Sequence, residues 1–526
     1  MKEPRIVSLR DAEDVGRFDA EALATFPGQA MDRAAGSPVV PGNRLSLQFE
    51  GPLTFDAWIE AIDRAERFVH FENYILRDDR VGRAFRDALI AKARQGVPVR
   101  VIYDWFGCWA TPQRYWRPFR EAGVEVRAFN RPSLDDPFGL LQRDHRKVVC
   151  VDGRVAFVGG FCVGEEWAGT ATEPPWRDTG VEIEGPAASV AARSFERMWA
   201  LMGTPVPDEI RVDEESQPAA GDTPVWVVEG QPGRSRVYRT MQLIAAYAKN
   251  RIWITDPYFV APRPVAEALS AAARDGVDVR ILLPAHNNWP WVGSMSRGGY
   301  RFLLESGVRL FEWQGPMIHA KTSVADGVWS RVGSSNLNNA SLLGNFEIDV
   351  SVLDHSLAQQ LEGLFLADMA SSVEIVLPRH HMSLFRATER ARLDDEPGPP
   401  QALLEPVGRH SPQPAPVRKP GGKRGKGTGW KLANLIRAGA TLGSAIAGQR
   451  SLGPEDRSLL GAVTLLFGGV ALAAASYPAV VGWIIAVIAG WFGVVTGVRA
   501  FLQSRSARLE ERKLRKIYDR LDREPQ

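Results

Sequence analysis

The sequence repeats one pattern of strand, helix and strand, and this repeat limits the possible folds more than any other feature. The two copies read RFVHFENYI (67–75) with ALIAKARQGVPVRVIY (88–103), and RIWITDPYF (251–259) with ALSAAARDGVDVRILL (268–283). In each copy a strand-like run leads into a helix that ends at a glycine, Gly96 or Gly276, and a second strand follows. This succession predicts an α/β sandwich in each half of the chain.

A short polar motif follows each copy and repeats the same spacing. It consists of His145, Lys147 and Asp152 in the first half, and of His319, Lys321 and Asp326 in the second. A His-x-Lys-x4-Asp pattern is expected at about one in 10⁴ starting positions for average composition. Two of them at equivalent places in a chain with only eight histidines therefore indicate a functional site.

The spacing of the histidine and the lysine suits a reaction at a phosphodiester. Residues i and i+2 of a strand project from one face, so His145 lies beside Lys147, and His319 beside Lys321. An imidazole supplies a nucleophile or a proton, and an ammonium group neutralises phosphoryl oxygens. The six motif residues are therefore our candidate catalytic residues.

The aspartates of the motif allow two interpretations. Asp152-Gly153 and Asp326-Gly327 each follow a strand-like run, which is the signature of a two-residue hairpin turn. A structural role in the turn and a direct catalytic role both remain open for Asp152 and Asp326.

Further candidates follow in each half. A glycine-led turn, Gly159 to Cys162 or Gly333 to Asn336, would let backbone amides approach a phosphate, and we expect Ser334 and Asn336 to bind it. Asp178 and Glu347 come next, and either carboxylate could fix the tautomer of a histidine. The alternative for both acids is an exposed position at a strand end.

Together, the paired His-x-Lys-x4-Asp motifs, the Gly-Ser-x-Asn turn ending at Asn336, and the WRDT and NFE segments resemble the phospholipase D superfamily, especially its bacterial cardiolipin synthase branch. The resemblance covers roughly residues 49–385. It implies a single site in which one histidine forms a phosphohistidine and the other protonates the departing alkoxide, without a metal or another cofactor. It also implies that Lys147, Lys321 and Asn336 cradle the phosphate.

By analogy we assign His145 as the nucleophile and His319 as the general acid, although the two roles could be exchanged. Two features depart from the family pattern. Cys162 stands where an asparagine is usual, and the apolar segment described below is C-terminal rather than N-terminal.

Composition narrows the class of protein. The formal net charge is only +2, from 64 basic and 62 acidic residues, which argues against a dedicated nucleic-acid binder. The three cysteines follow no metal-ligand or disulfide spacing, and the first residues lack the apolar core of a signal peptide. We therefore expect the body of the protein to face the cytoplasm.

A charge-free segment predicts a membrane anchor. Residues 459–498 contain no Asp, Glu, Lys or Arg and are interrupted only by Ser476, Tyr477 and Pro478. At about 1.5 Å per residue the two parts rise roughly 26 and 30 Å, close to the thickness of a bilayer core. Arginines on both sides place both ends in the cytoplasm. A buried soluble hairpin is the alternative.

The predicted fold class is α/β, with two tandem α/β sandwich repeats of phospholipase D type that form a pseudo-dimer, plus a C-terminal transmembrane helical hairpin. The expected domains are an N-terminal extension (1–45), repeat 1 (46–212), repeat 2 (213–385), a Pro/Gly-rich basic linker (386–429), an interfacial or irregular segment (430–457), the transmembrane hairpin (458–503) and a charged tail (504–526).

Aromatic and arginine residues also cluster before each motif. The first cluster contains Trp105, Phe106, Trp109, Tyr115, Trp116 and Phe119 with Arg114, Arg117 and Arg120, and the second contains Trp289, Trp291, Arg297, Tyr300 and Arg301. Such clusters suit a bilayer interface, but core packing and stacking on single-stranded nucleic acid are alternatives.

The sequence thus predicts a phosphatidyltransferase at the bacterial inner (cytoplasmic) membrane. Its expected partners are that membrane and anionic phospholipid, and the reaction would join two phosphatidylglycerols into cardiolipin. The first alternative is a hydrolase that gives phosphatidic acid. A nucleic-acid phosphodiesterase and a weakly active lipid-binding membrane protein are more distant alternatives.

The anchor can be tested by shortening the chain. A protein that ends near Glu396 should stay in solution without detergent, because it lacks the charge-free segment, whereas the full chain should need detergent. Fractionation of both proteins by ultracentrifugation measures this. A full-length protein that stays in the supernatant without detergent would contradict the predicted hairpin.

Overall fold

The computed structural model describes residues 28–132, 142–212, 217–234, 236–377 and 476. The chain divides into two compact units, Met1–Ser451 and Leu452–Gln526, and the fold below is that of the first. The expected linker, transmembrane hairpin and tail lie outside the described residues, except for Ser476. Within the described ranges no helix combines the length and the apolar character needed to cross a bilayer.

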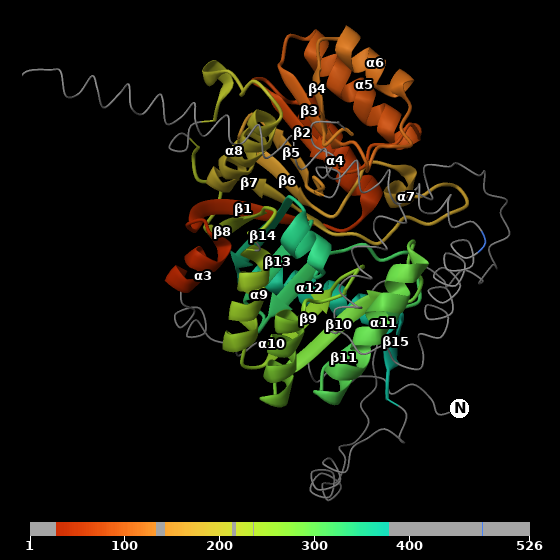
Figure 1. Cartoon of the computed structure of the whole chain (residues 1–526). Helices are drawn as coiled ribbons and strands as arrows, with labels where there is room; N and C mark the ends of the chain where they lie inside the picture. The colour runs from red at the N-terminus through yellow and green to blue at the C-terminus, as the bar shows by residue number, and fades with distance from the viewer. Residues whose placement is uncertain (1–27, 133–141, 213–216, 235, 378–475, 477–526) are drawn as a thin grey trace, which may run out of the picture. The chain divides into compact units, whose positions relative to one another are not determined.

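Helices and strands alternate along the described chain (Figure 1). The first half contains α3 (Gly28–Ala35), β1 (Val40–Gln48), α4 (Gly51–Asp63), β2 (Val69–Asn73), α5 (Arg80–Arg94), β3 (Val99–Asp104), α6 (Gln113–Glu121), β4 (Glu125–Phe129), β5 (Lys147–Val151), β6 (Val155–Gly159), α7 (Glu165–Ala168), β7 (Gly180–Glu184), α8 (Pro186–Leu201) and η3 (Asp208–Ile210). The second contains β8 (Thr223–Gly230), α9 (Arg236–Tyr247), β9 (Arg251–Thr255), α10 (Arg263–Arg274), β10 (Asp278–Pro284), α11 (Pro290–Glu305), β11 (Arg309–Trp313), β12 (Thr322–Ala325), β13 (Trp329–Gly333), η4 (Ala340–Gly344), β14 (Glu347–Leu353), α12 (His355–Ala370) and β15 (Ser372–Ile375).

The described strands form one mixed sheet of 15 strands, in the order β15-β11-β10-β9-β12-β13-β14-β8-β1-β7-β6-β5-β2-β3-β4. Reading outward from the central antiparallel pair of β1 and β8, the strand order is the same on both sides, with β15 added at one edge. The outer strands β2-β3-β4 and β9-β10-β11 are parallel, and helices connect them. This arrangement is the α/β architecture that the repeat predicts.

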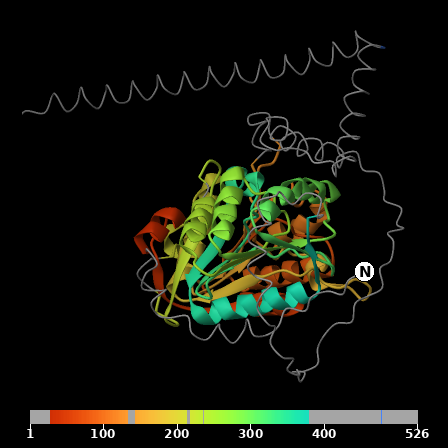
Figure 2. The ribbon, with the colours of Figure 1, turned by 90° about the horizontal axis from the view of Figure 1, so that it is seen from below.

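Helices cover both faces of the sheet because nearly every central strand is buried on both sides. Helices α4, α5 and α6 pack on one face of the first half, and α9, α10 and α11 on one face of the second. The opposite face is covered by α8 and α12, which share one apolar cluster with strands of both halves. Figure 2 shows the teal helix α12 on the other side of the strands from the green helices. The two halves also meet directly, since β6 lies against β13 and β14.

Strand register corrects the alignment of residues 67–75 with 251–259. Val148 of β5 pairs with Glu72, and the equivalent Thr322 of β12 pairs with Thr255, not with Asp256. The first strands of the two halves therefore match with a shift of one residue. Asp256 in the second half is thus the structural counterpart of Asn73 in the first.

The N-terminal part of the chain takes part in the fold. Strand β1 spans the expected boundary between residues 45 and 46 and joins the halves. Helix α3 packs against α9 of the second half. The domain limits expected from the sequence remain predictions.

Several residues of the first aromatic cluster are core residues, so the interfacial interpretation is wrong for them. Tyr115, Trp116 and Phe119 are buried, and Trp116 stacks on Tyr103 with ring centroids 3.9 Å apart. Helix α6 turns these rings inward because they lie three and four residues apart. Trp109 is 51% exposed and remains a candidate for an interface. In the second cluster, Tyr300 is buried.

The motif aspartates occupy tight turns at the far ends of β5 and β12 from the lysines. Asp152 and Asp326 adopt left-handed φ angles of 57° and 51°, followed by glycines of positive φ, as a two-residue hairpin turn requires. The Asp152 carboxylate accepts hydrogen bonds from the backbone N–H groups of residues 66–68, at 2.8–2.9 Å. Asp326 accepts the equivalent bonds from residues 249–251. These contacts favour the structural role over direct catalysis.

We therefore expect Asp152→Ala to destabilise the fold. It removes three hydrogen bonds to a buried carboxylate and leaves backbone donors without an acceptor, a loss of roughly 2–4 kcal/mol. Urea unfolding measures the change, with the exposed Asp63→Ala as the control, which should shift stability by less than about 0.5 kcal/mol. A stable Asp152→Ala protein that is nevertheless inactive would restore the catalytic interpretation.

Candidate active site

The two motif histidines are held by backbone bonds to the opposite half of the chain. His145 precedes β5, and its N–H donates to the carbonyl of Phe346, at 2.9 Å. His319 precedes β12, and its N–H donates to the carbonyl of Arg177, at 2.6 Å. Each histidine therefore lies beside the acidic segment of the other half.

The carboxylates also pair with histidines of the opposite half. His145 Nδ1 lies 3.0 Å from Glu347 Oε2, and His319 Nδ1 lies 2.6 Å from Asp178 Oδ2. All four side chains are buried, the imidazoles being 8% and 5% exposed. Asp178 and Glu347 thus contact histidines across the interface between the halves, and their histidine-orienting role stays a prediction.

Asp178 is held by two donors besides the histidine. The indole Nε1 of Trp167 donates to Oδ2 at 2.8 Å, and the N–H of Thr179 donates to Oδ1 at 2.8 Å. Gly160 leaves room for this carboxylate, since a Cβ there would lie 2.1 Å from Oδ1. Burial alone would raise the pKa of Asp178, but His319 and Lys321 outweigh it and lower that pKa. Asp178 is therefore a charged partner for His319.

Glu347 is held differently. The hydroxyl of Ser334 donates to Oε2 at 2.6 Å, and the Asn345 amide donates to Oε1 at 3.3 Å. Burial raises the pKa of Glu347 to about 7, against the opposing effect of Lys147. We expected the Ser334 hydroxyl to bind a phosphate. In the structure it donates instead to the carboxylate that contacts His145.

The ammonium group of each lysine bonds to the backbone of its own histidine and lies near a tyrosine ring. Lys147 Nζ donates to the carbonyl of His145 and lies 5.0 Å from the ring centroid of Tyr74. Lys321 Nζ donates to the carbonyl of His319 and lies 5.8 Å from the ring centroid of Tyr258. The i, i+2 spacing thus brings each ammonium group to the backbone carbonyl of its own histidine.

The ammonium nitrogen of Lys321 also lies 3.0 Å from both Nδ1 and Nε2 of the His319 imidazole, so it contacts the ring as a whole. Because Nδ1 faces Asp178, the neutral ring carries its hydrogen there. Burial, and then Lys321, lower the pKa of His319 to about 3. Burial lowers the pKa of Lys321 to about 8, partly offset by Asp178.

The phosphate-binding turns differ between the halves. Asn336 is buried, its amide donates to the Ser341 hydroxyl at 3.3 Å, and its Oδ1 has no hydrogen-bond partner. Cys162 at the equivalent position is buried, and burial raises the pKa of its thiol. A neutral thiol is a weak donor, so only the second half offers an amide at this position.

Some residues of the site were missed in the sequence. Tyr74 and Tyr258 lie near the histidines, with ring centroids 4.8 Å from His145 and 5.8 Å from His319. Their presence in both strand copies, NYI and PYF, was a usable signal. Trp167 had no such signal, because Ser341 stands at the position that matches it by chain offset.

The arrangement provides two buried imidazoles, each with a carboxylate on Nδ1, and two ammonium groups, each bonded to the backbone carbonyl of its histidine. Such a pair can attack an anionic ester and protonate its leaving group. In the described ranges no group of three or more His, Cys, Asp or Glu side chains is placed to hold a metal ion.

Comparisons with known proteins agree on one family. The family model described as "Cardiolipin synthase, PLD-like domain" matches residues 58–199 and 242–369. The chain is 35% identical over 360 residues to cardiolipin synthase A of Pseudomonas putida, covering 68% of this chain and 74% of that protein. It is 32% identical over 373 residues to cardiolipin synthase A of Pseudomonas syringae, covering 70% and 77%.

A solved structure shares the fold. Phosphatidylserine synthase of Haemophilus influenzae superposes with a TM-score of 0.54 at 12% identity, covering 70% of this chain and 98% of that one. The likeness identifies an α/β fold of phospholipase D type with a large mixed sheet.

The hydrogen position on His319 can be measured. We expect the neutral tautomer with hydrogen on Nδ1 at pH 7, persisting down to about pH 4 because the pKa is about 3. Nitrogen-15 chemical shifts of labelled histidines report it, and Asp178→Asn, which removes the acceptor charge, should change the tautomer signature of His319 only. A charged His319 ring at pH 7 without substrate would contradict this arrangement.

Proposed function

Since the chain belongs to the cardiolipin synthase family of phospholipase D-like proteins, we propose that it is a phosphatidyltransferase that joins two phosphatidylglycerols into cardiolipin and releases glycerol. The observation that carries this proposal is the crossed pairing of His145 with Glu347 and of His319 with Asp178. It builds one site from two halves, as we expect of two tandem repeats that form a pseudo-dimer.

In the proposed first step, His145 Nε2 attacks the phosphorus of one phosphatidylglycerol. A phosphorus–nitrogen bond forms, the phosphorus–oxygen bond to glycerol breaks, and His319 gives its proton to the departing alkoxide. In the second step His319 takes the proton from a hydroxyl of the second phosphatidylglycerol. That oxygen attacks the phosphohistidine, so His145 is regenerated and cardiolipin leaves.

Binding of the phosphate prepares His319 for its role. The phosphoryl oxygens would pair with the ammonium group of Lys321, which weakens the effect of its positive charge on the His319 ring. The negative charge of the phosphodiester then raises the pKa of His319, and charged Asp178 stabilises the imidazolium. Asp178 behind His319 is charged, whereas the pKa of Glu347 behind His145 is raised. This difference between the two carboxylates supports His319, rather than His145, as the general acid.

The phosphate itself would be held by Lys147, Lys321 and Asn336. The two ammonium groups are buried at the site, where a low dielectric strengthens their attraction to phosphoryl oxygens. The Asn336 amide would turn from Ser341 to the ligand. Asp152 and Asp326 would act only by fixing the turns that hold β5 and β12.

Transfer rather than hydrolysis requires that an alcohol outcompete water at about 55 M, which a pocket can achieve through effective molarities of about 10⁵ M or more. The burial of both imidazoles limits access of water and supports transfer. The C-terminal hairpin, a cytoplasmic catalytic body and attachment to the bacterial inner membrane are part of the proposal. They rest on the charge-free segment.

Product analysis tests the proposal. Purified protein in phosphatidylglycerol vesicles should yield more cardiolipin than phosphatidic acid by mass spectrometry. His145→Ala and His319→Ala should each lower the rate by at least about 10³-fold, because each removes one essential step. EDTA should have little effect.

Trapping separates the two roles. His319→Ala should still form a phosphoenzyme from a lipid with a good leaving group, such as a nitrophenyl phosphodiester, whereas His145→Ala should not. Phosphoenzyme in His145→Ala would exchange the roles. Phosphatidic acid as the sole product of the wild-type protein would replace the synthase by the hydrolase.

A further inference from the structure

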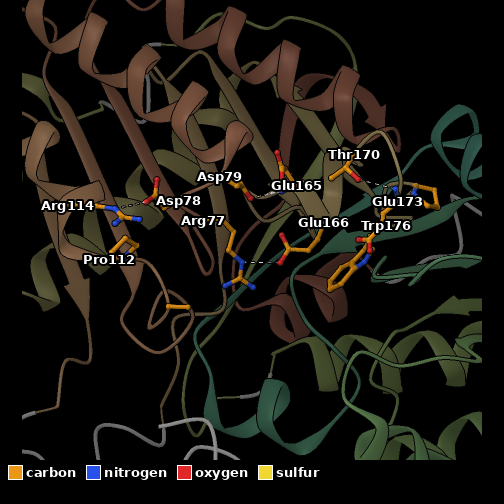
Figure 3. Close-up of a pocket in the computed structure, with 12 residues that line it drawn as sticks. Arg77, Asp78, Asp79, Pro112, Arg114, Glu165, Glu166, Thr170, Glu173 and Trp176 are labelled. Atoms are coloured by element: carbon orange, nitrogen blue, oxygen red, sulfur yellow. Dashed lines mark hydrogen bonds and ion pairs between the residues drawn. The ribbon is translucent and has the colours of Figure 1, made fainter. Parts of the chain in front are cut away.

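A cavity of about 680 Å³ lies in the first half of the protein, and seven of the twelve residues that line it are charged (Figure 3). It is formed by the segment after β2, the start of α6, helix α7 and the loop that follows α7. Its volume falls within the range of small-molecule sites, about 300–1,000 Å³. The charged walls exclude an acyl chain and select a hydrophilic ligand.

One end of the cavity lies near the catalytic centre. Trp176 lines the cavity, and its ring centroid lies 5.9 Å from that of His319. In Figure 3, Trp176 lies at one end, Arg114 at the other, and the pair of Arg77 and Glu166 between them. A group attached to a phosphate at His319 could therefore extend past Trp176 into the cavity.

Internal contacts hold the walls in place. Arg77 Nε lies 3.1 Å from Glu166 Oε1, and Arg114 Nε lies 3.3 Å from Asp78 Oδ2. The Asp79 carboxylate accepts bonds from the N–H groups of Gly82 and Glu165, both at 2.8 Å. The cavity thus presents guanidinium donors and carboxylate acceptors side by side, with the Arg77 side chain 30% exposed and that of Arg114 81% exposed.

The second half shows that the fold does not require these charges. Asp79 and Pro262 are the N-cap residues of α5 and α10, and the N–H groups of Arg77 and Val260 donate to the equivalent carbonyls of Val163 and Leu337. The counterparts of Arg77, Asp78, Asp79, Glu165 and Glu166 are therefore Val260, Ala261, Pro262, Asn339 and Ala340. Five ionisable residues in one half correspond to none in the other.

The chemistry of the lining favours a polyol. A hydroxyl both donates and accepts hydrogen bonds, so it can use a guanidinium and a carboxylate together. An ammonium group can only donate, so it could bond to the carboxylates but not to the guanidinium groups. A second phosphate would be opposed by the carboxylates, which outnumber the arginines in the lining.

We propose that this cavity is the headgroup site of the enzyme, and that it holds the glycerol hydroxyls of phosphatidylglycerol beside His319. The assignment rests on the proposed function for the presence of a phospholipid substrate, but it does not depend on whether transfer or hydrolysis follows. The departing and the entering glycerol would use the same site in turn, because both exchange their proton with His319.

Headgroup release from two lipids tests the site. Phosphatidylglycerol places a polyol in the cavity, whereas the headgroup of phosphatidylmethanol is too short to enter it. Ala110→Trp fills the cavity from its lining, and Glu166→Gln removes one charge. Each should lower kcat/KM for glycerol release by about tenfold, as expected for lost bonds to charged groups, with methanol release changed less than about twofold. Glu60→Gln, on the exposed face of α4, is the matched control.

The outcomes separate the two proposals. Equal losses on both lipids, or no loss on either, would overturn the headgroup site. A loss confined to phosphatidylethanolamine, tested in parallel, would overturn the polyol in favour of an ammonium ligand. Phosphatidic acid as the sole product would overturn the synthase alone, because headgroup release is scored before the second step. A wild-type protein that releases neither headgroup would overturn both.

Discussion

Everything in the catalytic centre depends on two carboxylates that cross between the halves of the chain. Asp178 and Glu347 are fully buried, and each finds its imidazole partner only in the opposite half. Leaving a buried polar group without its hydrogen-bond partner typically costs about 1–3 kcal/mol, and more for a charged group. Neither half can therefore complete its own histidine, and docking of the halves is coupled to formation of the site.

The two halves share one backbone fold, but the side chains around their catalytic histidines differ. Trp167 and a charged Asp178 support His319, whereas Ser334 and a carboxyl of raised pKa support His145. Five of the charged residues that line the polar cavity beside His319 have uncharged counterparts in the second half. A symmetric scaffold thus provides different surroundings for an imidazole that attacks phosphorus and for one that exchanges protons with an alcohol.

The motif aspartates illustrate how a repeated pattern can mix chemistry with architecture. Asp152 and Asp326 recur at fixed spacing from the histidines, yet their carboxylates bind backbone N–H groups at the other ends of β5 and β12. Their spacing reflects the length of a short strand rather than a reacting geometry. A turn that fixes the start of β2 or β9 also fixes the register of the neighbouring motif strand.

The sequence by itself determined the repeated α/β architecture, the pairing of each histidine with its lysine and the identity of the two acids, because these depend on local periodicity and spacing. Only the tertiary structure decided which acid serves which histidine, since the partners are 202 and 141 residues apart. It also brought the Ser334 hydroxyl into a hydrogen bond with Glu347 and the Trp167 indole into one with Asp178. The alignment of β2 with β9 differs by one residue from the alignment of the sequence repeats. These contacts arise where the two halves of the chain meet, and the pattern of a single strand does not show which residues of the other half will face it.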